Sequence, residues 1–254
     1  MHILVTNDDG VLAPGLLALA QAMRPLGEVT VMAPDRNWSA SGHVKTLHRP
    51  LRVRDVVLAD GSPAFSSDGA PSDCVALAML GFIKEKIDLV VSGINPMANV
   101  GHDVTYSGTV TAAMEAVISG VPGVAVSLDS PEAFEGLLDY STAAAVAKTV
   151  AEKVIADGLP KGTLLNVNLP YLKESELKGY MITRQGLRVY HDKLDARLDP
   201  RNRPYYWIGG DVPTGVPAEG TDVGALSGGY VSITPLQLDL TDYKAIEVLK
   251  NWKF

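Results

Sequence analysis

The feature that most constrains this chain is an alternation of short Val- and Ile-rich segments with segments of helical period. Such an alternation is typical of βαβ units built around a parallel sheet. The segments expected to form strands are 2–6, 28–34, 51–58, 62–67, 87–93, 123–128 and 163–170. The segments expected to form helices are 14–26, 71–83, 132–157, 241–252 and one that carries Val110 to Ile118. The sequence therefore predicts an α/β fold with a mostly parallel sheet, and strands 51–58 and 62–67 are expected to pair as an antiparallel hairpin.

The pattern changes after about residue 171, where Pro, Gly and aromatic residues replace the helical period. We expect an α/β core over residues 1–170 and a C-terminal extension over 171–254, made of a β-hairpin arm or long loop and a terminal amphipathic helix. An isolated arm rarely buries its own aromatic residues. Tyr205, Tyr206 and Trp207 are therefore expected to pack on a neighbouring subunit or on the core, and the first of these predicts a homodimer or larger homo-oligomer.

Charge and composition exclude several classes of protein. The 22 Lys and Arg against 29 Asp and Glu give a net charge of −7, which leaves no basic surface for stable nucleic-acid binding. The single cysteine, Cys74, can form no internal disulfide, which suits a reducing cytoplasm. No apolar run reaches transmembrane length, and the first residues lack the pattern of a signal peptide. We expect a soluble cytoplasmic protein that binds no membrane.

Two aspartates, Asp8 and Asp9, stand side by side where the first predicted strand ends. Ligands of parallel sheets bind beyond the carboxyl ends of the strands, where the polar loops gather. A tight turn before Gly10 is the simpler interpretation, because Asp-Gly is a strong turn signal. The segment that follows is helical rather than a return strand, however, so the second carboxylate favours a bound divalent cation. Oxygen ligands select hard ions such as Mg²⁺ or Mn²⁺.

Ser39 and Asn95 lie in two other polar loops of the same predicted edge. Either could complete the ligand set of a cation held by Asp8 and Asp9. Taken alone, each has a simpler explanation: Asn95 as a strand-end turn, and Ser39 as one small residue among several in a flexible loop. They are candidates because both loops are expected to lie at the same edge of the sheet as Asp8 and Asp9.

The segment "YSGTVTAAMEA" (106–116) opens a predicted helix with Ser107 at the N-cap and Gly108 and Thr109 in the first turn. The backbone N–H groups and the dipole of a helix N-terminus form an anion site, and the hydroxyls can donate to phosphate oxygens. Ordinary capping explains Ser107 equally well, so the spacing leaves both interpretations open.

Other phosphate and metal motifs are missing from the sequence. No G-x-G-x-x-G follows the first strand, there is no Walker A lysine motif, and no HExxH occurs. His43 and His102 fall in polar loops and are candidate proton donors, although loop histidines are more often solvated. Arg36 and Lys45 could offset substrate charge or simply lie on the surface.

Five segments together resemble the SurE family of stationary-phase survival proteins and 5′/3′-nucleotidases: "TNDDGVLAPGL", "PDRNWSASGH", "SSDGAPSDCV", "SGINPMANVGHDVTYSGTVTAAMEA" and "LLNVNLP". They occur in the family's order and cover most of residues 1–170. The resemblance implies a Rossmann-like core and a metal-dependent phosphomonoesterase acting on nucleoside monophosphates, and in some members on short polyphosphate. It also implies homodimers or homotetramers formed through exchanged C-terminal segments.

The resemblance also assigns expected roles to individual residues of this sequence. It implies one divalent ion, Mg²⁺ or Mn²⁺, per subunit, with metal ligands at Asp8, Asp9, Ser39 and Asn95. It implies phosphate contacts from Asn99, Ser107, Gly108 and Thr109. One departure is Met97, since the family usually has glycine two residues after the metal-binding asparagine. If that position needs a positive φ, Met97 is strained and the loop must adjust.

On this hypothesis the cation polarises a phosphoryl oxygen and activates a water that attacks phosphorus in line, while Asn99 and the helix start stabilise the developing charge. Asp8 and Asp9 are the catalytic candidates, and Asp8 is the one expected to orient or deprotonate the water. One alternative is a sensor module that binds metal and nucleotide with incidental hydrolysis. A second is a Rossmann oxidoreductase, which the missing glycine fingerprint disfavours.

Overall fold

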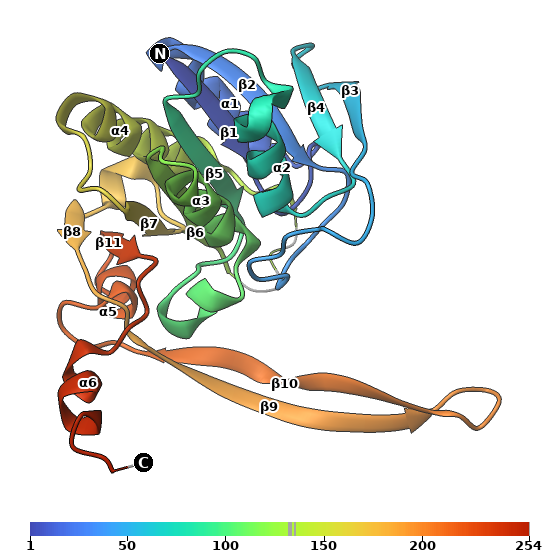
Figure 1. The fold of residues 1–254 in the computed structure, drawn as a ribbon, viewed down its shortest axis with the longest axis vertical. Helices are drawn as coiled ribbons and strands as arrows, with labels where there is room; N and C mark the ends of the chain where they lie inside the picture. The colour runs from blue at the N-terminus through green and yellow to red at the C-terminus, as the bar shows by residue number, and fades with distance from the viewer. Residues whose placement is uncertain (132–133, 135, 254) are drawn as a thin grey trace.

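The computed structural model describes residues 1–131, 134 and 136–253, which form one large sheet with helices on both faces and a long arm (Figure 1). The strands of the sheet are β1 (His2–Thr6), β2 (Glu28–Pro34), β3 (Val53–Val57), β4 (Pro63–Ser67), β5 (Leu89–Asn95), β6 (Gly123–Asp129), β7 (Thr163–Pro170), β8 (Tyr180–Ile182) and β11 (Val231–Gln237). Their order is β3-β4-β2-β1-β5-β6-β7-β11-β8.

The centre of the sheet is parallel, as predicted. β1 pairs in parallel with β2 and β5, β5 with β6, and β6 with β7. The predicted hairpin is confirmed as β3 and β4, which extend one edge through a parallel β2–β4 pair. At the other edge β11 runs antiparallel to β7, and β8 pairs in parallel with β11. The C-terminal extension thus contributes two strands to this sheet, and a boundary at residue 170 stays a prediction.

Helices cover both faces because successive residues of a strand point to opposite sides. On one face, α1 (Pro14–Met23) and α4 (Ser141–Asp157) pack on Ile3 and Val5 of β1. On the other, α2 (Pro71–Leu77) and α3 (Gly108–Ile118) pack on Leu4. All three of these β1 side chains are fully buried, and burial of each contributes roughly 1.5–3 kcal/mol. The sheet is therefore the rigid base from which the loops at its carboxyl edge project.

Two predicted helices are shorter than expected for reasons visible in the sequence. α1 ends at Met23 and continues as a 3₁₀ turn, η1 (Arg24–Leu26), in which Pro25 lacks an amide hydrogen. α2 gives way to a wider turn, η2 (Ala78–Phe82), in which Gly81 has a φ of 105°. A right-handed helix cannot continue through that backbone conformation.

The predicted helix over 132–157 is wrong in its first part. Residues 132, 133 and 135 lie outside the described part of the chain, and the helix that is described, α4, starts at Ser141. Gly136 has a φ of 130°, which a right-handed helix does not allow. Leu137, which lies in the same part of the predicted helix, is 91% exposed.

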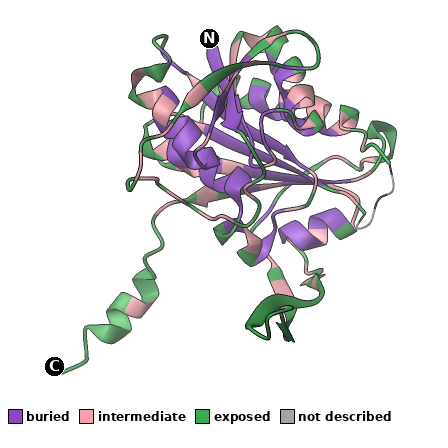
Figure 2. Cartoon of the chain, turned by 90° about the vertical axis from the view of Figure 1, so that its right-hand side faces the viewer, coloured by how far each residue is buried: buried purple, intermediate pink, exposed green. Residues whose placement is uncertain are grey.

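The arm consists of two long antiparallel strands, β9 (Leu187–Leu198) and β10 (Pro204–Val216), that project from the body of the molecule (Figure 1). Most of their residues are exposed, as Figure 2 shows in green. Tyr206 and Trp207 are 61% and 64% exposed, so these two aromatic side chains do not pack on the core of their own chain. Packing of these aromatic side chains on a neighbouring subunit stays a prediction.

The remaining helices follow the arm. α5 (Asp222–Ser227), which the sequence pattern did not predict, packs beside β11, and α6 (Tyr243–Leu249) lies within the predicted terminal helix. Asp242 caps α6 by accepting hydrogen bonds from the amides of Lys244 and Ala245. No helix of the described chain combines the length and the apolar character needed to cross a membrane.

Candidate active site

The candidate site lies where β1 and β5 end side by side. Thr6 pairs with Ser92, so the residues that follow each strand emerge together at the carboxyl edge of the sheet. Asp8 and Asp9 come directly after β1, and Asn95 is the last residue of β5. The topology therefore brings three of the predicted ligands to one place.

The turn after β1 is held by Asn7 rather than by the aspartates. The Asn7 side chain donates to the carbonyl of Gly10 at 3.0 Å and accepts from the amide of Gly10 at 3.2 Å. Gly10 has a φ of 107°, which favours glycine. Because Asn7 supplies the contacts of the turn, a tight turn does not account for the two carboxylates.

Asp8 is buried against the start of α3. It is 3% exposed, and its Oδ1 accepts a hydrogen bond from the hydroxyl of Thr109 at 2.5 Å. Burial raises the pKa of Asp8, and the hydrogen bond from Thr109 partly offsets that rise. The close approach depends on Gly108, since a Cβ there would lie 2.7 Å from the Cβ of Asp8.

Asp9 adds a second carboxylate beside Asp8 and is half-buried. Burial, and then the neighbouring charge of Asp8, raise the pKa of Asp9 to about 7. Over the described residues, no Lys, Arg or His forms an ion pair with either aspartate. Two adjacent acids without a cationic partner form an environment that a divalent cation would stabilise.

The other two predicted ligands differ in how firmly they are held. Asn95 is buried, and its side-chain nitrogen donates to the carbonyl of Met97 at 2.5 Å, so its side-chain oxygen is available to a cation. Ser39 is exposed in the loop after β2. The residue before Ser39 fixes this loop to the turn after β1, because the backbone amide of Trp38 donates to the backbone carbonyl of Asp8 at 2.7 Å.

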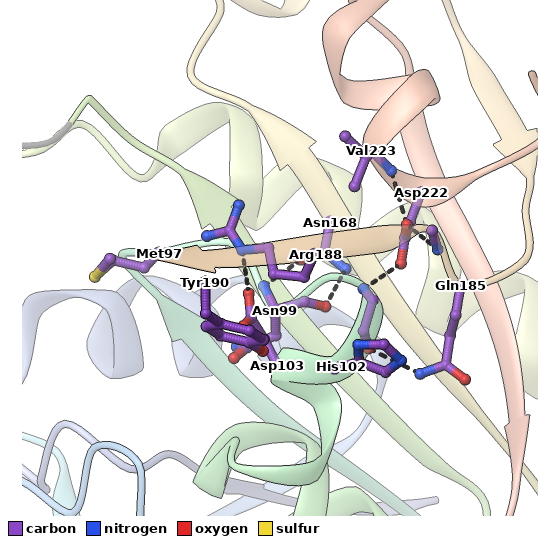
Figure 3. A network of polar contacts seen from close by, with 12 residues as sticks. Met97, Asn99, His102, Asp103, Asn168, Gln185, Arg188, Tyr190, Asp222 and Val223 are labelled. Carbon is purple, nitrogen blue, oxygen red and sulfur yellow. Dashed lines mark hydrogen bonds and ion pairs between the residues drawn. The ribbon is translucent and has the colours of Figure 1, made fainter. Parts of the chain in front are cut away.

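The condition for strain at Met97, a positive φ, is not met. The non-glycine residues with positive φ in the described chain are Ala40 and Asn202. Met97 therefore has an ordinary backbone, and its side chain is 54% exposed. The loop accommodates methionine because the side chain points outward rather than into the turn, as Figure 3 shows.

The start of α3 serves both as a cap and as a polar face of the site. The Ser107 hydroxyl oxygen accepts from the amide of Val110 at 3.1 Å, which confirms the capping interpretation and leaves its hydrogen free to donate. The Thr109 hydroxyl already donates its hydrogen bond to Asp8. The backbone amides of Gly108 and Thr109 also lower the pKa of Asp8, so the anion that this helix start faces here is the Asp8 carboxylate.

Asn99 is fixed by two asparagines of β7 that the sequence pattern did not single out. The amide of Asn99 donates to Oδ1 of Asn168 at 2.8 Å, and its carbonyl accepts from Nδ2 of Asn166 at 2.8 Å. Its own side chain donates to the hydroxyl of Ser127 at 2.8 Å. Polar residues at alternate positions of an otherwise buried strand, as in "LLNVNLP", were the available signal.

The loop that carries Ser39 is attached to α3 by Glu115, another residue that sequence reasoning missed. Glu115 is 4% exposed and accepts from His43 at 3.0 Å and from Lys45 at 2.9 Å. Burial alone would raise the pKa of Glu115, but these two hydrogen bonds lower it overall. His43 and Lys45 therefore hold the loop in place. Arg36 pairs with Asp35 at 3.2 Å.

The base of the arm docks on the loop that follows Asn99 (Figure 3). Asp103 accepts from the hydroxyl of Tyr190 at 2.7 Å and pairs with Nε of Arg188 at 2.8 Å. Gln185 donates to the carbonyl of Gly101 at 2.8 Å. The amide of Gly101 donates to Asp222, at 2.8 Å. These contacts fix the arm to the edge of the candidate site.

The fold and the site define an α/β protein with two adjacent carboxylates, one buried and one half-buried, at the carboxyl edge of a parallel sheet. A family model described as "Survival protein SurE" matches residues 3–192, and the chain belongs to the SurE family. It is 51% identical to the 5′-nucleotidase SurE of Chloroflexus aggregans over 100% of both chains. It is 52% identical to that of Herpetosiphon aurantiacus, over 99% of this chain and 98% of the relative.

The fold is also that of a solved member of the family. The crystal structure of the SurE protein from Aquifex aeolicus superimposes with a TM-score of 0.81 and 41% sequence identity, covering 98% of each chain. This likeness extends over the arm and the terminal helix as well as the core. The predicted α/β fold with its C-terminal hairpin is confirmed.

Proposed function

We propose that this protein is a divalent-metal-dependent 5′-nucleotidase, which hydrolyses nucleoside monophosphates to nucleoside and phosphate. The observation that carries the proposal is the adjacent pair of Asp8, buried against the start of α3, and half-buried Asp9, neither of which forms an ion pair with a cationic side chain of the described residues. The full-length similarity to proteins named 5′-nucleotidase SurE supports the same reaction.

Metal dependence is general in the SurE family, and the residues of this site fit a hard cation. We propose that one Mg²⁺ or Mn²⁺ per subunit is held by carboxylate, hydroxyl and amide oxygens from Asp8, Asp9, Ser39 and Asn95. When bound, the ion supplies Lewis-acid chemistry and lowers the pKa of coordinated water. All other contributions come from the side chains and backbone of this chain.

The phosphate is placed between the metal ligands and the start of α3. The Ser107 hydroxyl and the second amide hydrogen of Asn99 can donate to phosphate oxygens, since each has one hydrogen not used within the protein. The positive end of the α3 dipole adds to these donors, while the Gly108 and Thr109 amides stabilise the Asp8 carboxylate. These donors oppose the negative charge that develops on the equatorial oxygens.

Asp8 is proposed to orient the attacking water and to accept its proton. The hydrogen bond from Thr109 fixes Oδ1 of Asp8 and so sets the orientation of its carboxylate. Thr109 is therefore a positioning residue that acts through Asp8, with its hydroxyl and its backbone amide both directed at that carboxylate.

The test is phosphate release from AMP and GMP by the purified protein with Mn²⁺ or Mg²⁺, repeated after chelation. We expect release that depends on the metal. Nucleotide binding by calorimetry without release under any divalent ion would contradict the proposal and favour a metal- and nucleotide-binding sensor.

We further propose that copies of this chain associate through the extension 171–254 as a homodimer or homotetramer. The arm carries exposed apolar side chains, among them Trp207 at 64% and Ile208 at 84% exposed. The apolar side chains of α6 are also exposed, with Val248 at 64%. Sedimentation that gives only monomer at micromolar concentration would contradict the association.

We propose a cytoplasmic location for the protein. Its single cysteine, Cys74, is free and buried, so folding requires no oxidising compartment. Burial also raises the pKa of the Cys74 thiol, which keeps it neutral and unreactive.

A further inference from the structure

A cavity of about 340 Å³ lies next to the candidate site, between the loops after β5 and β6 and the base of the arm. It is lined by Met97, Asp129, Ser130, Arg188, Val212 and Pro213, among others. The volume is at the lower end of the range for small-molecule sites. None of these residues has a role in the metal and phosphate chemistry proposed above.

The cavity and the paired aspartates share the loop after β5 as a common wall. Asn95 donates to the carbonyl of Met97, and the hydroxyl of Ser130 donates to the carbonyl of Pro96 at 2.5 Å. Along the sheet, β1, β5 and β6 are neighbours, and adjacent strands are about 4.8 Å apart. The ends of β1 and β6 are thus roughly 10 Å apart, a distance that one nucleotide can span.

A β-bulge supplies the apolar wall of the cavity. The pairing of β9 with β10 shifts between Asp211 and Thr214, so that Val212 and Pro213 together oppose Tyr190. Bulges turn side chains out of the ordinary alternation and are common beside functional sites. The Tyr190–Asp103 hydrogen bond holds the bulge against the core. Val212 and Met97 are 43% and 54% exposed, so their apolar surfaces are available to a ligand.

The opposite side of the cavity is polar and carries two charged side chains, Arg188 and Asp129. The Nε of Arg188 pairs with Asp103, while its terminal nitrogens point away from that carboxylate in Figure 3. Neither those nitrogens nor the Asp129 carboxylate form a hydrogen bond or an ion pair with the residues the structure describes. Arg188 lies close enough to offset part of the rise that burial causes in the pKa of Asp129.

We propose that this cavity binds the nucleoside part of the substrate, with the base against Met97, Val212 and Pro213 and the ribose hydroxyls donating to Asp129. The terminal nitrogens of Arg188 donate to acceptor atoms of the base. This assignment rests on the proposed nucleotidase function, and it makes the arm a part of the substrate site. A vicinal diol and a flat apolar ring are the two chemistries that a carboxylate and an apolar wall recognise together.

The test compares AMP, 2′-deoxy-AMP and glycerol 2-phosphate as substrates of three variants. Asp129→Asn removes the charged acceptor, and Val212→Asp places a charge in the apolar wall. Asp192→Asn is the matched control, because Asp192 is exposed on β9 outside the cavity. We expect Asp129→Asn to lower kcat/KM for AMP about tenfold more than for glycerol 2-phosphate. The preference for AMP over 2′-deoxy-AMP should shrink in the same variant.

We expect Val212→Asp to raise KM for both nucleotides with little change in kcat, and Asp192→Asn to behave like the unaltered protein. Equal effects on AMP and glycerol 2-phosphate in both cavity variants would overturn the proposal. If the unaltered protein released no phosphate from any ester, the proposed function itself would fail. Calorimetric binding of adenosine, lost in Asp129→Asn and retained in Asp192→Asn, tests the cavity in that case, and unchanged binding in both would overturn it.

Discussion

The paired-aspartate site and the arm differ in how much of their chemistry is satisfied within one chain. Around Asp8 the turn, the helix start and the neighbouring loops are tied together by hydrogen bonds, and the side chain is almost fully buried. Along β9 and β10 most residues are exposed (Figure 2), and Trp207 is 64% exposed. The residues of the site are thus held in place within one chain, whereas the arm is held only at its base, where it meets the loop after Asn99.

This difference implies that substitutions in the site change catalysis, whereas substitutions at the far part of the arm change association. The largest effect is expected for Asp9→Asn. Loss of a charged metal ligand should lower metal-dependent phosphate release from AMP by at least about a hundredfold, since even outer-shell partners are worth 10- to 100-fold. The fold should persist, because the variant removes a buried like-charge contact with Asp8. Asp55→Asn, on exposed β3, is the control, and full activity of Asp9→Asn would contradict the ligand assignment.

Gly108→Ala should have the second largest effect. A Cβ at this position lies 2.7 Å from the Cβ of Asp8, so either Asp8 or the start of α3 must move. We expect a loss of about 1–3 kcal/mol in the free energy of unfolding and a fall in kcat. Gly209→Ala on the arm is the matched control, because its nearest atom is 4.0 Å away. Equal denaturation midpoints and rates for the two variants would show that the approach of α3 to Asp8 is not needed.

Glu115→Gln should have a moderate effect that reaches the metal through the loop carrying Ser39. The variant weakens the contacts to His43 and Lys45 and should lower the free energy of unfolding by about 2 kcal/mol. Because the folded-state pKa of Glu115 is lowered, its contribution to stability is present at neutral pH. That contribution is lost as the pH falls through the lowered pKa.

The measurements for this variant are the pH dependence of unfolding and the affinity for Mn²⁺ by calorimetry. Glu152→Gln, on the exposed side of α4, is the control. The interpretation of Glu115 as a positioning residue requires a several-fold weaker Mn²⁺ affinity. If the affinity were unchanged while stability fell, Glu115 would have a purely structural role.

Trp207→Ser should have the smallest effect on stability, within about 0.5 kcal/mol, because the side chain is exposed. Its effect on association should be much larger, since an aromatic residue of this size is a common anchor of interfaces. Sedimentation velocity at several concentrations would measure the shift toward monomer. An unchanged distribution of oligomers would remove this part of the arm from the interface.

Much of the fold follows from local patterns that the sequence displays directly. The apolar segments around Leu4, Val90 and Val124 are buried on both faces of a parallel sheet, so they read as continuous apolar runs. The boundaries of α2 and α4 were harder to predict, because they depend on Gly81 and Gly136 adopting positive φ. The backbone conformation of a glycine within an apolar segment cannot be predicted from the sequence pattern alone.

The candidate site was predictable only in part for a similar reason. Asp8 and Asp9 stand out because two like charges at one turn need an explanation. Asn168 and Glu115 do not, since their roles depend on contacts with residues about 70 positions away in the sequence. Thr109 was expected to donate to phosphate, but its hydroxyl donates to Asp8, 101 positions away in the sequence. Such long-range pairings arise only when the strands have assembled.

The central claim is that Asp8 and Asp9 hold a divalent cation, and titration of the metal-free protein with Mn²⁺ by calorimetry tests it most directly. We expect one ion to bind per chain, and Asp9→Asn to abolish that binding while keeping the circular dichroism spectrum of the unaltered protein. No binding by the unaltered protein, or equal binding by Asp9→Asn, would contradict the claim.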